Sequence, residues 1–421
     1  MNKTIRIPRF AASEVRERLT EVPAVVLLGP RQIGKSTLAI RLAARWPSGG
    51  EYLDVEAPPD ARRLADPYFY LRALPPRLGV IDEAQRMPEL FPVLRAVIDE
   101  NRRRGFEAGQ FLVLGSAWLD LVMASTESLA GRVSLVELTG INVDEAASVG
   151  ISEQALWVRG GFPSALLAPS DRVSFHWRTD LIRSYLERDV PLFGRRVPAE
   201  TLRRLWVMLA HNSGGLLNAS KLAQNLSISG PTVSSYLDLL VDLRLTRRLE
   251  PWFANVGKRV IKSPKMYVRD SGLLHALLEL RTLGDVLGHP SVGASYESFV
   301  VECLITAASA YQAYFYRTAR GAEDEVDLVL VRGGQPQVAI EVKLSSAPTV
   351  GAGFYRCCDD LGVKCRYLVH PDDGAVPYVQ HGVTVIGLSQ MVARLRGGVD
   401  AVEGAAQNGT RNGADNGTAR G

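Results

Sequence analysis

The sequence has few cysteines and no long apolar run. Only four of its 421 residues are cysteine, all beyond residue 300, so disulfides cannot hold the chain together and a reducing compartment is expected. Cys357, Cys358 and Cys365 lack the paired spacing of a zinc site, which predicts plain thiols. No apolar stretch approaches the ~18 residues of a membrane span, and the first ten residues lack the apolar core of a signal peptide. We therefore expect a cytoplasmic protein without membrane contact.

Lysine is also scarce, although the composition is otherwise that of a globular protein. Hydrophobic residues make up 46% and charged residues 22%, which excludes wholesale disorder. At ~150 residues per domain the length suggests roughly three domains. The net charge of +4, from 49 basic and 45 acidic residues, decides nothing about nucleic acid. Because only eight of the basic residues are lysine, a lysine inside a chemical motif carries more weight than an arginine would.

Apolar strands and helical stretches alternate in the first third of the chain. Short apolar runs lie at 24–28, 78–81, 111–114 and 133–138, and a helix is expected at 36–45. Strands separated by helices predict an α/β fold, a parallel sheet with helices on both faces.

A complete phosphate-binding loop follows the first of these strands. It fits the pattern G-x-x-x-x-G-K-[ST] and consists of Gly29, Pro30, Arg31, Gln32, Ile33, Gly34, Lys35, Ser36 and Thr37. The glycines let backbone N–H groups face the phosphates, and the start of the following helix adds partial positive charge. Lys35 would reach the β and γ phosphates of ATP, and Ser36 would bind Mg²⁺. The sequence therefore predicts an ATP site.

Two adjacent acids end the second apolar strand. Asp82 would hold Mg²⁺ through water, and Glu83 would polarise the attacking water. Acids at a strand end are often only solvated, but a phosphate loop about fifty residues upstream favours catalysis. Glutamate after aspartate favours a hydrolase over a small-molecule kinase.

Several segments together resemble an uncharacterised group of prokaryotic AAA-type ATP-binding proteins, over residues from about 20 to 390. Besides the phosphate loop, they are 78–84, 114–116, 128–132, 159–163, 185–189, 262–267 and 270–273. The resemblance implies ATP binding and an AAA-type ATPase core. It leaves the physiological role open, because the C-terminal part of that group has no known function.

The resemblance also suggests two further catalytic residues. Ser116, at the end of the third strand, would touch the γ phosphate and the lytic water, as the sensor residue of AAA-type ATPases does. Its alternative is a serine that only caps the strand. Arg132 could stabilise developing charge, or be an ordinary arginine among the 41 in the chain.

The middle of the chain has the pattern of a winged helix. A helix at 216–226 with Ser220 as its N-cap, a turn at 227–230, a helix at 232–243 and a wing at 245–252 are expected. Four acids and nine basic residues lie between 216 and 275; the basic ones are Lys221, Arg244, Arg247, Arg248, Lys258, Arg259, Lys262, Lys265 and Arg269. This local charge predicts nonspecific DNA binding. The presumed recognition helix has no Lys or Arg, so sequence-specific readout is not expected and a packing or dimerisation role stays open.

The C-terminal third contains a pattern similar to restriction endonucleases, in which Asp327 is followed after thirteen residues by Glu341 and then Lys343. If the hairpin is symmetric about Gly334, the two carboxylates face each other ~5 Å apart and need a cation between them. Such a site would hold Mg²⁺ or Mn²⁺, with Lys343 acting on the attacking water. The resemblance adds Glu297 as a further metal ligand. The alternatives are a solvated hairpin or a nuclease fold without activity.

These inferences combine into one expected organisation. An AAA-type P-loop ATPase core is placed at 1–145, a helical lid at 146–210, a winged-helix region at 211–285, an α/β restriction-endonuclease-like domain at 286–395 and a disordered tail at 396–421. We expect an ATP-hydrolysing protein whose nucleotide cycle controls a DNA-binding, metal-dependent nuclease module. The alternative is a nucleotide-switched regulatory protein that binds a partner and cuts nothing. Homo-oligomerisation stays open.

Overall fold

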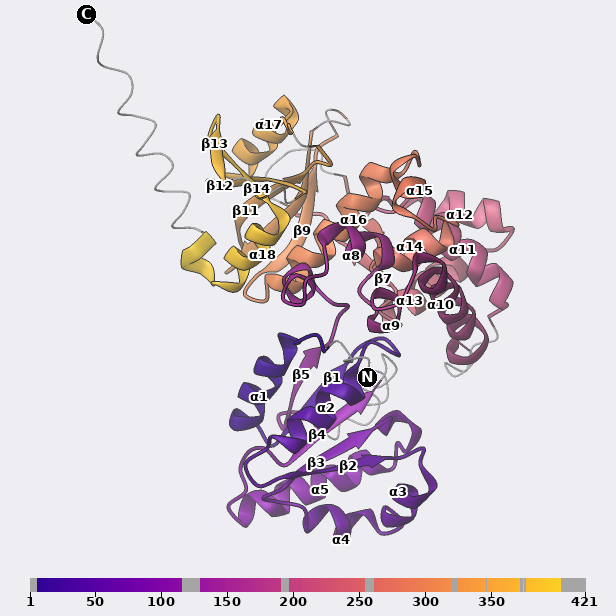
Figure 1. Ribbon diagram of the computed structural model, residues 1–421, viewed down its shortest axis with the longest axis vertical. Helices are drawn as coiled ribbons and strands as arrows, with labels where there is room; N and C mark the ends of the chain where they lie inside the picture. The colour runs from indigo at the N-terminus through magenta and orange to yellow at the C-terminus, as the bar shows by residue number, and fades with distance from the viewer. Residues whose placement is uncertain are drawn as a thin grey trace, which may run out of the picture. The chain divides into compact units, whose positions relative to one another are not determined.

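The computed structural model describes residues 6–115, 129–190, 197–253, 261–319, 321, 324–345, 347–371, 374 and 376–402. Contacts between residues divide the chain into two compact units, drawn in Figure 1. Unit 1 comprises 1–141 with two short segments, 162–164 and 242–245, and unit 2 comprises the remainder. The expected boundaries near 210 and 285 both fall within unit 2. The expected start of a disordered tail at 396 is wrong, because Val402 is buried and its carbonyl oxygen accepts a hydrogen bond from Tyr367. Residues beyond 402 lie outside the described part of the chain.

Unit 1 contains a five-stranded parallel sheet in the order β2-β3-β4-β1-β5. The strands are β1 (Ala24–Leu28), β2 (Gly50–Asp54), β3 (Leu78–Asp82), β4 (Phe111–Gly115) and β5 (Val133–Glu137). Every residue of β1, β3 and β4 is buried, as expected of parallel strands covered on both faces. The parallel α/β sheet predicted from the sequence is therefore confirmed. Strand β2 was not predicted, because its sequence alternates polar and apolar residues only weakly.

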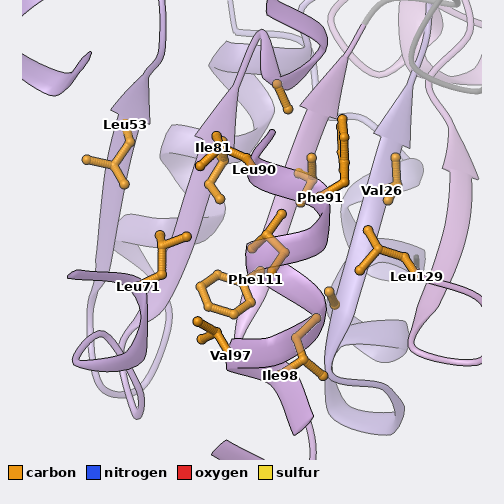
Figure 2. Packing of buried hydrophobic residues seen from close by; sticks show 14 of the residues in the cluster. Val26, Leu53, Leu71, Ile81, Leu90, Phe91, Val97, Ile98, Phe111 and Leu129 are labelled. Atoms are coloured by element: carbon orange, nitrogen blue, oxygen red, sulfur yellow. The ribbon is translucent and has the colours of Figure 1, made fainter. Parts of the chain in front are cut away.

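Two groups of helices accompany this sheet. They are α1 (Ala11–Glu21) with α2 (Lys35–Ala44), and α3 (Pro58–Arg63) with α4 (Pro67–Arg72), the short η1 (Ala84–Arg86) and α5 (Leu90–Arg103). Figure 2 shows how Leu90, Phe91, Val97 and Ile98 of α5 pack against strand side chains such as Phe111. The core holds the strand ends in register, and those ends carry the phosphate loop and the two acids.

Unit 2 begins with helices. They are α7 (Val143–Ala147), α8 (Glu153–Arg159), α10 (Asp171–Ser184), the π-helical turn η2 (Tyr185–Asp189), α11 (Ala199–His211), α14 (Ser271–Leu277) and α15 (Leu283–Leu287). Helix α9 (Pro163–Leu166) is divided, since Pro163 and Ser164 are assigned to unit 1. Asp270 caps α14 through the N–H of Leu273 and also accepts the N–H of Gly161 at 2.7 Å. One carboxylate thus joins the two family segments 159–163 and 270–273.

The winged-helix pattern corresponds to two helices and a small sheet. Helix α12 (Ala219–Leu226) precedes α13 (Gly230–Asp242), and β6 (Gly215–Leu216), β7 (Thr246–Leu249) and β8 (Lys265–Val268) pair in the order β6-β8-β7. The expected cap at Ser220 is wrong, because Asn218 accepts the N–H of Lys221 and α12 starts earlier. The expected helical residues near 216 belong instead to β6.

The last part of unit 2 is a six-stranded mixed sheet with three helices. Its order is β13-β14-β12-β11-β10-β9. The elements are α16 (Val292–Ala307), β9 (Gln312–Arg317), β10 (Glu325–Arg332), β11 (Gln335–Val342), α17 (Ala352–Leu361), β12 (Cys365–His370), β13 (Tyr378–Gln380), β14 (Val383–Gly387) and α18 (Leu388–Arg396). The four cysteines of this region are buried and form no disulfide.

The hairpin β10–β11 reaches its pairing in an unexpected way. Gly333 and Gly334, both with positive φ, form a two-residue turn closed by the pair Arg332 and Gln335. A bulge then shifts the register, so that Leu328 pairs with Ile340. The turn is centred between Gly333 and Gly334, whereas the pairs beyond the bulge are symmetric about Gly334, which is the symmetry that the sequence reasoning assumed for Asp327 and Glu341.

Candidate functional site

The phosphate loop connects β1 to α2 in the form that the sequence predicted. Gly29 has no room for a side chain, since a Cβ there would lie 2.4 Å from the carbonyl oxygen of Leu138. Gly34 has φ +102°, a conformation that side chains disfavour, and it caps α2. Outside the loop, Arg9 donates to the carbonyl oxygen of Ile33 at 3.1 Å and to that of Thr139 at 2.6 Å. The loop is thus supported from two neighbouring segments.

Lys35 is buried within this loop. Its ammonium donates to the carbonyl oxygens of Gly29 at 3.0 Å and Pro30 at 2.9 Å, and the residue is 6% exposed. The cationic group is therefore held inside the loop, where the pattern places the phosphates.

Asp82 and Ser36 meet through a tyrosine that the sequence reasoning missed. Tyr52 of β2 donates to Asp82 at 2.5 Å and is also hydrogen-bonded to Ser36. Burial, together with the hydrogen bond to Asp82, raises the pKa of Tyr52. Mg²⁺ prefers oxygen ligands such as a carboxylate and a hydroxyl. The hydrogen bonds to Tyr52 show that the two groups lie close together. These residues therefore fit a Mg²⁺ ion accompanying nucleotide.

Glu83 adopts a strained conformation directly after β3. Its φ is +53°, which is uncommon outside glycine, and its carboxylate accepts a hydrogen bond from Gln85. Strand β4, whose end precedes Ser116, lies between β3 and the loop-bearing β1. Ser116 itself lies outside the described residues.

Arg132 does not lie at the nucleotide end of the sheet. Its carbonyl oxygen accepts the N–H of Ala24, which begins β1, whereas the phosphate loop follows the end of that strand. Five residues at ~3.3 Å each separate the two ends by roughly 16 Å. The guanidinium group forms a two-point ion pair with Asp99 at 2.8 Å. This position gives no support to a catalytic role at the chain's own nucleotide, because the side chain cannot span the strand.

The C-terminal pattern residues do come together. The register that pairs Leu328 with Ile340 continues to Asp327 opposite Glu341, and the N–H of Val342 donates to Asp327 at 3.0 Å. The pairing of β10 with β9 has a second irregularity between Val326 and Val329, next to Asp327. Such bulges change the direction in which side chains point. Lys343 pairs with Glu341 at 2.7 Å.

A lysine from outside the pattern lies among these carboxylates. Lys265, the first residue of β8, is 3% exposed and places its ammonium 3.0 Å from Glu297 and 3.5 Å from Asp327. It also forms an ion pair with Glu325, whose other oxygen is 3.1 Å from Arg317. Glu297 therefore joins the cluster, as the resemblance implied, but a protein ammonium group supplies the positive charge.

The electrostatics of the cluster reflect its burial. Burial raises the pKa of Glu297 to about 7, and the neighbouring Asp327 adds to this, against the lowering effect of Lys265. Burial and Asp327 raise the pKa of Glu341 to about 8, against the lowering effect of Lys343. Burial and the crowding of carboxylates therefore make both carboxyls weaker acids than exposed glutamates.

The cluster does not fit a divalent metal. The Tyr267 hydroxyl donates to Glu297 at 2.8 Å, and the Lys265 ammonium lies between Glu297 and Asp327, at the place where a shared metal would have to bind. Within the ranges that the structure describes, no group of three or more His, Cys, Asp or Glu residues is arranged to hold a metal ion.

Much of the predicted basic patch is used internally. Arg247 of β7 and Arg269 both pair with Glu302, and Arg248 pairs with Asp238. Arg244 pairs with Glu137, while Lys258 and Arg259 lie outside the described residues. The sequence count of positive charge therefore overstates what the region presents to a polyanion.

The fold and the phosphate loop define an AAA-type, ATP-binding protein. Residues 21–147 match the family described as an AAA domain, and residues 152–284 and 292–391 match two families described as domains of unknown function, DUF8612 and DUF4143. None of the described helices is both long and apolar enough to cross a membrane.

The chain belongs to the same family as two mycobacterial proteins. It is 42% identical over 369 residues to "Uncharacterized protein Rv2008c" of Mycobacterium tuberculosis and to "Uncharacterized protein Mb2031c" of Mycobacterium bovis. The match covers 88% of this chain and 81% of each relative. Among solved structures, the Aeropyrum pernix ORC1 protein in complex with DNA is 14% identical over 66% of this chain and 94% of that chain, with a TM-score of 0.27. That similarity is too low to transfer function.

Proposed function

We propose that the chain hydrolyses ATP with Mg²⁺ and acts as a nucleotide-dependent regulatory protein whose unit 2 binds a partner. The observation that carries this proposal is the buried Lys35 in the phosphate loop, with Ser36 and Asp82 joined through Tyr52. Lys35 would bind the β and γ phosphates. Ser36 and Asp82 would hold Mg²⁺, which neutralises phosphate charge.

The same arrangement assigns hydrolysis to Glu83. The carboxylate follows Asp82 at the end of β3 and is held by Gln85, so it can accept a proton from an attacking water. Ser116 keeps its proposed sensor role, since the end of β4 precedes it in the sheet between β1 and β3.

ATP binding and turnover separate these roles. Lys35→Ala should weaken ATP binding at least about tenfold, or about 1.4 kcal/mol, whereas Lys221→Ala, at an exposed lysine of α12, should not. Glu83→Gln should bind ATP normally and lose turnover. The assignment is wrong if Lys35→Ala and Glu83→Gln both hydrolyse ATP at the parent rate.

DNA binding by the winged-helix region is the second candidate. The helix pair α12–α13 beside a three-stranded sheet favours it, and Lys221 and Lys262 are exposed. Phosphate contacts would make the affinity fall steeply with salt. Lys221→Glu with Lys262→Glu should then weaken binding to all duplexes alike and flatten the salt dependence. Unchanged affinity would leave the region a packing or partner-binding role.

Metal-dependent cleavage by Asp327, Glu341 and Lys343 is the least supported part of the sequence prediction. Lysine ammonium groups already pair with the carboxylates that would have to bind the metal, Lys265 with Glu297 and Asp327 and Lys343 with Glu341. Plasmid DNA incubated with the protein and Mn²⁺, with and without ATP, should stay intact. Nicking that Asp327→Asn abolishes would restore the nuclease assignment.

A further inference from the structure

The C-terminal acidic cluster already contains a cation. Glu297 of α16 and Glu325 and Asp327 of β10 surround the Lys265 ammonium, while its side chain is nearly inaccessible to water. Three carboxylates this close repel one another unless a positive charge lies between them. In the pattern inferred from the sequence a divalent metal would supply that charge.

The ammonium group suits this place chemically. It has three N–H donors, which is the number of carboxylates it contacts. Its nitrogen lies 3.0 Å from Glu297 and 3.5 Å from Asp327, distances that suit N–H donors and ion pairs. A metal bound between Glu297 and Asp327 would therefore have to displace the ammonium, which would lose two of its three carboxylate partners.

We propose that Lys265 is a built-in cation that replaces a divalent metal in the C-terminal acidic cluster. The cluster then ties β8 of the small sheet to α16 and β10, and it is closed to metal chemistry while the lysine is in place. This rests on the proposed function and extends it, because it gives a physical reason why unit 2 would bind a partner without cleaving DNA. It does not depend on ATP hydrolysis.

Metal titration of the full-length protein without nucleotide tests the proposal. The parent should show no saturable Mn²⁺ site with a dissociation constant below about 1 mM. Lys265→Ala should gain one site, at least about tenfold tighter than any binding by the parent, and its melting temperature should rise with Mn²⁺. Adding Asp327→Asn to Lys265→Ala should remove both effects.

Lys343→Ala is the matched control. It removes the lysine of the sequence pattern, which pairs with Glu341 alone among the carboxylates of the described cluster, so it should gain no Mn²⁺ site. If Lys265→Ala does not fold, the double variant Lys265→Met with Glu325→Gln takes its place in the titration. It removes one positive and one negative charge, so the net charge of the cluster stays the same.

Two results overturn the proposal. One is Mn²⁺ binding by the parent that Asp327→Asn abolishes, because a metal would then coexist with the lysine. The other is a folded Lys265 variant that binds Mn²⁺ no better than the parent. Either result leaves the ATP-binding assignment untouched, since Lys35 and Glu83 are tested separately.

Discussion

Glu302 should be one of the residues on which the stability of unit 2 depends most. It lies on α16, and its carboxylate accepts hydrogen bonds from Arg247 at 2.7 and 3.0 Å and from Arg269 at 2.8 and 2.6 Å. The Glu302 side chain is only 16% exposed. Glu302→Gln keeps the shape of the side chain and removes its charge, leaving two guanidinium groups without their shared counter-ion.

Two estimates of the cost agree. Burial alone would raise the pKa of Glu302, but Arg247 and Arg269 outweigh it and lower the pKa from 4.5 to about 2. At about 1.4 kcal/mol per pKa unit, this corresponds to roughly 3 kcal/mol of folding stability. Breaking a buried ion pair from one side typically costs about 3–5 kcal/mol. We therefore expect Glu302→Gln to lower the free energy of unfolding by about 3 kcal/mol at pH 7.

Urea unfolding followed by circular dichroism measures this change. The matched control is Asp238→Asn, which removes an exposed partner of Arg248 and should cost no more than about 1 kcal/mol. Because the folded-state pKa of Glu302 is lowered, the difference between parent and Glu302→Gln should be complete above pH 4.5. It should shrink as the pH falls towards 2. Equal effects of the two substitutions at pH 7 would refute the reasoning.

Two further predictions concern backbone space and pH. Gly160→Ala should destabilise the protein by at least about 3 kcal/mol, since its Cβ would lie 2.2 Å from the Asp270 carboxylate. Gly150→Ala is the control: it has nearly the same φ and nothing within 4 Å, so it should cost only about 1 kcal/mol. Similar losses of stability for the two variants in thermal denaturation would argue against the contact with Asp270. Burial and Asp327 raise the pKa of Glu341 to about 8, so the stability from its neutral form is complete below pH 4.5 and is lost as the pH rises through 8. Unfolding free energies at pH 5 and 9 should differ less in Glu341→Gln than in the parent, and an unchanged difference would contradict the assignment.

Local sequence indicated where the phosphate loop and the two acids lie, but not all of their contacts. The phosphate loop and Asp82 lie at strand ends, where spacing along the chain fixes position in space, so Lys35 and Asp82 were found directly. Tyr52 was missed because β2 has a weak strand pattern and its contact with Asp82 depends on which strands are neighbours in the sheet. Arg132, whose two interpretations the sequence left open, directly precedes β5, so in a parallel sheet it lies at the strand starts, opposite the edge that carries the phosphate loop.

The contacts of the C-terminal cluster could not be read from the pattern alone. Lys265 precedes Asp327 by 62 positions and reaches it only because the small sheet lies against α16 and β10 within unit 2. One signal was present: Lys265 begins a strand whose four residues are all buried, and a buried lysine needs a counter-charge. The count of charges overestimated the basic patch for the same reason, because Arg247 and Arg269 share one partner, Glu302, which lies 55 and 33 positions away in the sequence.

The bulge in the β10–β11 hairpin bears on how relatives should be recognised. Next to the Gly333–Gly334 turn, the register of the two strands would not pair Asp327 with Glu341. The extra residue at Gln337 shifts this register by one position and brings the two acids opposite each other. An ordinary ladder on the same turn would align the two acids with one residue fewer between them. The interval of thirteen residues is therefore not a geometric constant of such sites. Homologues with a gap at this position can keep the acids opposed, and searches that demand a fixed spacing will overlook them.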